Sequence, residues 1–190
     1  MLVALGFRAH SGWAAMVAVA GAPDTPRIPD RRRIVIANAD LPGSKQPYHA
    51  AEGLPFAAAE RLIQEAVESS RALAVEAISA VQKKLRAEGH KLAGCAVLTG
   101  SGKPLPELAK ILSAHPLIHN AEGVMFREVL LWAAKESGLG VLAVPEKTLD
   151  AESLERIGSL GKLIGPPWTQ DQKYAAVAAF CALAQTPMVF

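Results

Sequence analysis

Three strand-like segments precede the first long helix of this chain, and this order constrains the fold more than any other feature of the sequence. Residues 2–20 contain two apolar runs separated by a short polar turn at residues 8–12, and a third run follows at residues 33–36. Consecutive strands joined by short connections favour an antiparallel meander. The polar turn is important for function, because α/β proteins place binding and catalytic groups at the ends of strands.

Residues 56–88 form the first predicted helix. They contain neither Pro nor Gly, and their apolar residues recur at helical spacing with charged residues between them. The pattern predicts one long amphipathic helix, or two helices with a bend near Ser69 and Ser70. Gly89 follows as a C-cap, because glycine readily adopts the left-handed conformation that ends many helices.

The rest of the chain alternates between strands and helices. Short apolar runs predict strands at residues 92–98 and 141–144. Helices are predicted at residues 105–113, 121–137, 152–163 and 170–184. Asn120 and Thr169 are expected to cap the second and the fourth of these helices. Because helices separate the last two strands, these strands should add in parallel, which predicts a single α/β domain over residues 1–190 with a mixed five-stranded sheet.

Composition narrows the class of protein further. The 190 residues carry a net charge of +2, which does not by itself indicate nucleic-acid binding, since that usually needs a concentrated basic patch. The basic run at residues 31–33 is expected to be a solvated strand end rather than a phosphate contact. Cys95 and Cys181 lie in apolar runs and should be free, buried thiols. Without a membrane-spanning run or a signal-peptide pattern, the sequence predicts a cytoplasmic protein with no membrane partner.

Three segments carry a resemblance to a known family. Residues 5–13 read LGFRAHSGW, residues 95–99 read CAVLT, and residues 171–178 read DQKYAAVA. Together with the order of the elements, they resemble the first strand and turn, the fourth strand and the last helix of the ribonuclease H-like superfamily, and within it of the Holliday-junction resolvases. The resemblance implies a ribonuclease H-like sheet with three antiparallel leading strands and two parallel strands, flanked by helices.

The active site of that family carries over only in part. Its members use several carboxylates to hold two divalent metal ions about 4 Å apart for hydrolysis. Arg8 stands in the place of the first-strand Asp, and Thr99 or Gly100 in the place of the fourth-strand Glu. In the last helix Asp171 matches, whereas Tyr174 replaces a second Asp. Because a guanidinium repels Mg²⁺, the sequence predicts no metal and no cofactor, and the resemblance implies the scaffold without the nuclease.

Polar residues at the strand ends could still form a new pocket. The candidates are Arg8, His10, Ser11, Thr99, Ser101, Lys103, Asp171 and Lys173. Such a pocket would be cationic and rich in hydroxyl and backbone N–H groups, and so suited to a phosphate or a carboxylate. The competing interpretation is that Arg8 pairs with Asp171 and that this ion pair replaces the lost metal.

Three loops have an unusual composition. Residues 100–103, GSGK, are too short for a Walker A loop, and Pro104 stands where the Mg²⁺-binding hydroxyl would be, so a tight turn into a helix is expected. Residues 45–49 and 165–169 each join proline, an aromatic and polar groups ahead of a helix. These two loops could bind a substrate or dock a partner. Alternatively, they are rigid connections that an aromatic side chain anchors.

His115 and His119 have the spacing of zinc ligands on one helix, with Glu122 and Glu128 nearby. Pro116 disfavours helical geometry at His115. We therefore expect the helix to begin after His119, and no zinc site at this pair.

Two classes of function remain open. The first is a catalytically degenerate member of the superfamily that acts as a binding or interaction module, with an anionic small molecule or a nucleic acid as candidate partner, and a homodimer through an Ala-rich helix face as a candidate form. The second is an enzyme, either a metal-dependent nuclease or a phosphate-handling enzyme that uses His10 and Lys103. Candidate carboxylates of the nuclease are Asp171, Glu122, Glu128 and Glu146. Arg8 favours the first class.

Overall fold

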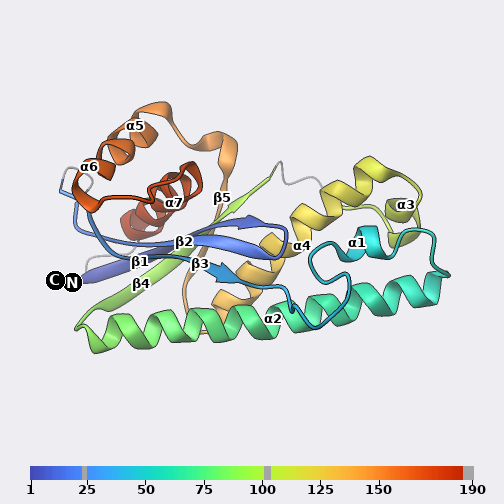
Figure 1. Cartoon of the computed structure of the whole chain (residues 1–190). Coiled ribbons are helices and arrows are strands. Elements are labelled where there is room, and N and C mark those ends of the chain that lie inside the picture. The colour runs from blue at the N-terminus through green and yellow to red at the C-terminus, as the bar shows by residue number, and fades with distance from the viewer. Residues whose placement is uncertain (23–24, 101–103, 186–190) are drawn as a thin grey trace.

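Figure 1 presents the computed structural model, which describes residues 1–22, 25–100 and 104–185. One sheet contains the strands β1 (Leu2–His10), β2 (Trp13–Ala20), β3 (Arg27–Val35), β4 (Lys91–Thr99) and β5 (Val141–Pro145). Their order across the sheet is β3-β2-β1-β4-β5. β1 pairs antiparallel with β2, and β2 with β3, whereas β1–β4 and β4–β5 are parallel. The predicted mixed sheet is therefore confirmed.

Helices cover both faces of this sheet (Figure 1). They are α1 (Pro47–Ala50), α2 (Phe56–Ala87), α3 (Leu108–Leu112), α4 (His115–Glu136), the 3₁₀ turn η1 (Glu146–Thr148), α5 (Ala151–Ser159), α6 (Gly161–Ile164) and α7 (Gln170–Gln185). α2 and α4 pack on one face, and α7 packs on the other with α5 beside it. None of the helices in the described part of the chain is both long and apolar enough to cross a membrane.

The alternation of side chains along β1 determines which residues reach α7. Val3, Leu5 and Phe7 are buried in the cluster that includes α2 and α4. The residues between them point to the opposite face, where Ala4 packs with α7 and Gly6 lies against its backbone. Arg8 follows Ala4 and Gly6 on the face that carries α7, because successive side chains of a strand point to opposite faces. It lies at the carboxyl end of β1.

The start of α4 differs from the prediction. The helix begins at His115, with a proline in its first turn, rather than after Asn120. In the first turn a backbone N–H has no intrahelical partner, so the missing N–H of Pro116 costs no hydrogen bond. The helix therefore passes through both His115 and His119, and the prediction that it begins after His119 is wrong.

Other element boundaries are confirmed or shifted. α2 is a single helix without a break near Ser69, and Gly89 follows its end with a φ of 78°. Thr169 caps α7 as predicted: its Oγ1 accepts from the N–H of Gln172, and its own N–H donates to Gln172 Oε1 at 3.0 Å, which is a capping box.

Three boundaries differ from the prediction. β3 begins at Arg27, earlier than predicted, because charged residues interrupt its apolar pattern. The four-residue α1 was predicted as loop, and the predicted helix at 152–163 consists of α5 and α6.

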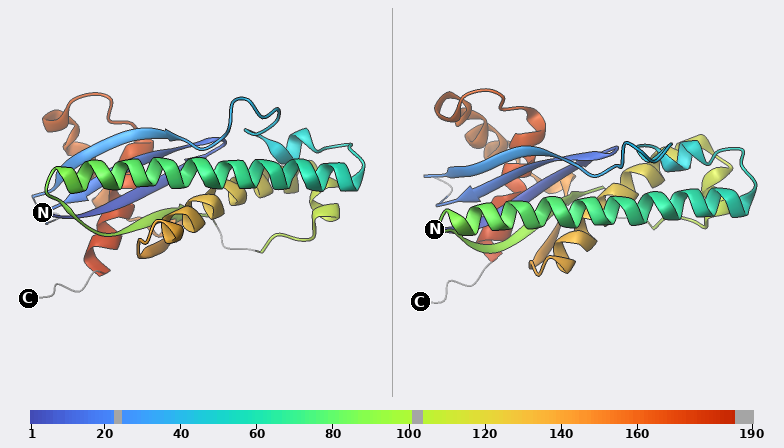
Figure 2. Two further views of the ribbon diagram at one scale, coloured as in Figure 1. Left: turned by 90° about the horizontal axis from the view of Figure 1, so that it is seen from below. Right: turned by 60° about the horizontal axis from the view of Figure 1, so that its bottom comes forward.

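A group of helices extends beyond the sheet. Figure 2 shows α2 running along the sheet and past its end, where α1, α3 and the beginning of α4 lie. Two small apolar clusters hold this extension together. Their buried members are Ala51, Ala59 and Ile63 in one cluster, and Ile111, Ile118 and Ala121 in the other.

Candidate functional site

Two carboxylates hold the guanidinium of Arg8 at the carboxyl end of β1. Its Nε and Nη2 donate to Glu146 at 3.2 and 2.7 Å, and its Nη1 donates to Asp171 Oδ1 at 2.6 Å. The ring of Tyr174 lies under the guanidinium, 4.5 Å from its Cζ. Burial, the largest single influence, lowers the pKa of Arg8, but the hydrogen bonds and charges of Glu146 and Asp171 together raise it above its ordinary value. Arg8 is therefore a fixed cation between two anions.

A row of stacked groups continues from this ion pair towards the edge of the sheet. His10 Nε2 lies 3.0 Å from Asp171 Oδ1. The imidazole stacks on the Trp13 ring, its partner across the β1–β2 pair, with 4.3 Å between the centroids and 10° between the planes. On the other side, Arg33 Cζ lies 4.1 Å from the centre of the Trp13 ring. The row thus ends in a second guanidinium stacked on an aromatic face.

A cavity of about 640 Å³ opens beside Arg8. It lies where the carboxyl ends of β1, β4 and β5 meet, which is the usual ligand position in α/β sheets. Polar side chains that line it are Arg8, His10, Thr99, Arg127, Glu146, Lys147 and Tyr174. Within residues 1–22, 25–100 and 104–185, no carboxylate forms an ion pair with Arg127 or Lys147. These two cations remain available to an anionic ligand.

The structure brings together part of the predicted set. Arg8, His10 and Thr99 line the cavity, and Asp171 binds both Arg8 and His10. The expected ion pair between Arg8 and Asp171 is thus confirmed. Ser11 is exposed in the β1–β2 turn, and Lys173 lies near Gly158 of α5 instead. Ser101 and Lys103 lie outside the described residues.

The sequence predicted no role for Arg127 or Lys147, and indicated Glu146 only as a candidate metal ligand. Glu146 follows β5 directly, so its place at a strand end was the available signal. Of the other candidate carboxylates, Glu128 is exposed on α4. Glu122 is buried and belongs to a separate cluster around His49.

The three arginines at residues 31–33 are occupied within the protein. Arg31 donates to the backbone carbonyls of Ile164, Gly165 and Pro167 at 2.8–2.9 Å. Arg32 pairs with Asp30, and Arg33 stacks on Trp13 as described. The run is therefore more than a solvated strand end, because each guanidinium has a partner. Arg31 also supports the rigid interpretation of residues 165–169, where Trp168 Nε1 donates to Ile157 O at 2.9 Å.

Both cysteines are free, as predicted. Burial raises the pKa of Cys95 to about 12. The half-buried Cys181 also has a raised pKa, first because of burial and second because of the negative charge of Asp150. Since the thiolate is the reactive form, neither side chain has the properties of a nucleophile at neutral pH.

The strand order, the two antiparallel and two parallel pairings, and the helices on both faces define a ribonuclease H-like fold. The structure is similar to Thermus thermophilus RuvC in complex with a Holliday junction substrate, with a TM-score of 0.55 and 16% sequence identity over 98% of each chain. A second RuvC structure from the same organism gives a TM-score of 0.54 and 15% identity over 97% of each chain. At the level of sequence, no family model and no curated protein gives a match. The similarity confirms the predicted fold, and at this identity it concerns the fold alone.

Proposed function

We propose that this protein is a catalytically degenerate resolvase-like module that binds the phosphate groups of a nucleic acid without hydrolysing them. The observation that carries the proposal is the Arg8 guanidinium held between Glu146 and Asp171. Two-metal hydrolysis requires carboxylates that are free to coordinate divalent cations. Here the two carboxylates at the strand ends are already neutralised in part by a side chain that cannot lose its proton.

The charges around the ion pair support a phosphate ligand. Arg8 balances one of the two carboxylates it contacts, while Arg127 and Lys147 add two cations at the same cavity. The Arg127 guanidinium reaches over Gly100, whose Cβ position lies 3.0 Å from its Nη1. Positive side chains around an open cavity suit phosphate oxygens, which accept charge-assisted hydrogen bonds.

Two observations favour a nucleic acid over a small anion as the ligand. The row from His10 through Trp13 to Arg33 extends the site along the sheet, further than one small anion needs. The structurally similar RuvC is known in complex with a Holliday junction substrate. His10 and Arg33 cover the two faces of the Trp13 ring, so the row is suited to contacts with the phosphate backbone rather than to base stacking.

Fluorescence anisotropy with a labelled four-way DNA junction and a linear duplex tests the proposal. We expect the wild-type protein to bind, and Arg127→Ala and Lys147→Ala to weaken binding several-fold on any sequence, each lowering the salt slope by about one. Lys83→Ala is the matched control, since Lys83 is an exposed lysine of α2 on the other face of the sheet, and its affinity should equal that of the wild type. If the wild-type protein binds neither the junction nor the duplex, a nucleic acid is not its ligand.

Cleavage of the same junction in Mg²⁺ or Mn²⁺ distinguishes the second candidate function, a metal-dependent nuclease. The observation that favours this candidate is that Glu146 and Asp171 do meet at one point. We expect intact DNA after prolonged incubation. Cleavage that is lost in Asp171→Asn would show that the carboxylates act as metal ligands and that Arg8 gives way to the metal.

A further inference from the structure

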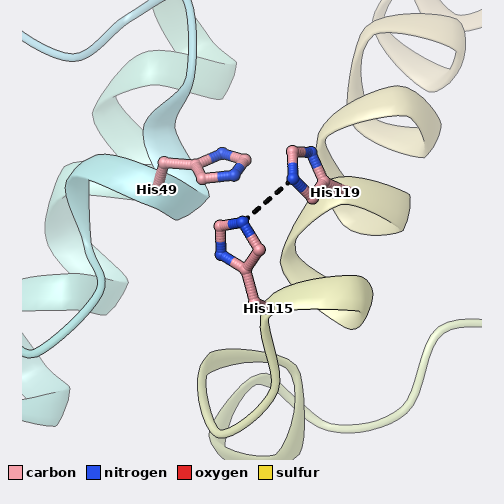
Figure 3. A group of neighbouring side chains, drawn as sticks. All are labelled: His49, His115 and His119. Atoms are coloured by element: carbon pink, nitrogen blue, oxygen red, sulfur yellow. Dashed lines mark hydrogen bonds between the residues drawn. The ribbon is translucent and has the colours of Figure 1, made fainter.

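Three histidines meet in the helical extension, away from the candidate site at the strand ends. His49 lies on α1, and His115 and His119 lie one turn apart at the beginning of α4. One ring nitrogen from each lies within 4.8 Å of the other two. Figure 3 shows the three imidazoles directed towards a common point between the two helices.

The distances match those of a metal site. His115 Nε2 and His119 Nε2 are 3.1 Å apart. Zinc–nitrogen bonds are about 2.0–2.1 Å long, so nitrogens that share a tetrahedral zinc ion lie about 3.3 Å apart. The three nitrogens lie within 4.8 Å of one another, so they would have to close by at most about 1.5 Å to share one ion.

A carboxylate at the far side of the His49 imidazole gives the site a second feature of metal centres. Glu122 Oε1 lies 3.2 Å from His49 Nδ1, which leaves Nε2 of His49 for the cluster. In His115 the Nε2 atom faces His119, and Glu52 Oε2 lies 3.9 Å from Nδ1, beyond hydrogen-bond distance. Histidines that bind metals commonly direct their other ring nitrogen to a carboxylate, which orients the ring and increases its basicity.

The burial of Glu122 gives a further indication that a cation binds at this cluster. The residue is 3% exposed, and its Oε1 accepts from the backbone N–H groups of Tyr48 and His49 at 2.9 and 3.2 Å. Its Oε2 is buried without a hydrogen-bond partner among the described residues. A buried carboxylate is costly unless positive charge compensates it. A divalent ion on His49 would provide that charge through one imidazole.

We propose that His49, His115 and His119 bind one zinc-class divalent ion that fastens α1 to α4. Three imidazoles favour zinc and its neighbours over Mg²⁺ or Ca²⁺, which prefer oxygen ligands. Three protein ligands leave a fourth position for water. Among the described residues, the extension contains two small apolar clusters, and small units of this kind are often stabilised by a metal.

Isothermal titration of the metal-stripped full chain with ZnCl₂, and Co²⁺ absorption spectroscopy, test the site. We expect one equivalent of zinc, a four-coordinate Co²⁺ spectrum, and a rise in Tm on binding. His49→Ala and His119→Ala should each weaken zinc binding at least 100-fold, and Glu122→Gln about 10- to 100-fold, as for other positioning carboxylates. His90→Gln, a histidine outside the cluster, should bind as the wild type does.

Two further measurements distinguish loss of zinc binding from misfolding. His115 and His119 are exposed, so the metal-free forms of His115→Ala and His119→Ala should unfold at the wild-type temperature, and loss of zinc binding will not reflect misfolding. Zinc should also slow hydrogen exchange at the amides of Tyr48 and His49, which Glu122 holds. No zinc binding by the wild type, or binding that survives in His49→Ala and His119→Ala alike, would overturn the site.

Discussion

Replacement of Gly6 by alanine is expected to destabilise the protein by about 3 kcal/mol and to lower its Tm by about 10 °C. The added Cβ would lie 1.8 Å from the carbonyl oxygen of Ala175 and 2.8 Å from the backbone nitrogen of Ala179. Both atoms belong to the backbone of α7, so no side chain can rotate away. The helix would have to move off β1, where it contributes to two of the apolar clusters.

Gly140→Ala is the matched control for this substitution. No heavy atom lies within 4 Å of the position that its Cβ would occupy, and its φ is not in the left-handed region. Urea unfolding of the two variants should therefore give a large loss of stability for Gly6→Ala and almost none for Gly140→Ala. Equal stability of the two would show that α7 does not pack this closely on β1.

Arg8→Ala is expected to destabilise the protein by about 2 kcal/mol. The substitution removes three hydrogen bonds to Glu146 and Asp171 and the contact with Tyr174, and leaves two carboxylates facing each other. Breaking a fully buried pair costs about 3–5 kcal/mol. The expected value is smaller because the Arg8, Glu146 and Asp171 side chains are 20%, 37% and 25% exposed, so that water screens the charges that remain.

An exposed ion pair of equal length serves as the control. Arg156 Nη2 lies 2.7 Å from Glu152 Oε1, the same distance as Arg8 Nη2 from Glu146 Oε1. Arg156→Ala should cost less than about 0.5 kcal/mol, as exposed helical pairs usually do. In urea unfolding, an Arg8→Ala variant that loses no more stability than Arg156→Ala would contradict the structural role of the ion pair.

The sequence predicted correctly those helices whose ends and length depend on neighbouring residues in the chain. The run without Pro or Gly at residues 56–88 predicted α2 almost to its last residue, and Thr169 with Gln172 carried the capping signal of α7. The local rule failed at Pro116, because a proline that disfavours a helix in its interior is well suited to its first turn.

The two candidate sites depend on contacts between distant parts of the chain. Glu146 meets Arg8 across 138 residues, and His49 meets Glu122 across 73. Neither pairing has a local pattern, and only the parallel pairing of β1, β4 and β5 and the packing of α1 on α4 bring these groups together. Arg127 has no local signal for the same reason, since helical spacing does not say which polar residue faces the sheet end. The cytoplasmic location and the homodimer remain predictions of the sequence.

The central claim is that Arg8 takes the place of a divalent cation between Glu146 and Asp171. A calorimetric titration of the wild-type protein with Mg²⁺ tests this claim most directly, because Mg²⁺ requires oxygen ligands and does not compete for the histidine cluster. We expect no binding heat beyond dilution for the protein alone. Clear binding of two Mg²⁺ ions that is lost in Asp171→Asn would contradict the claim and show that the carboxylates still form a metal centre.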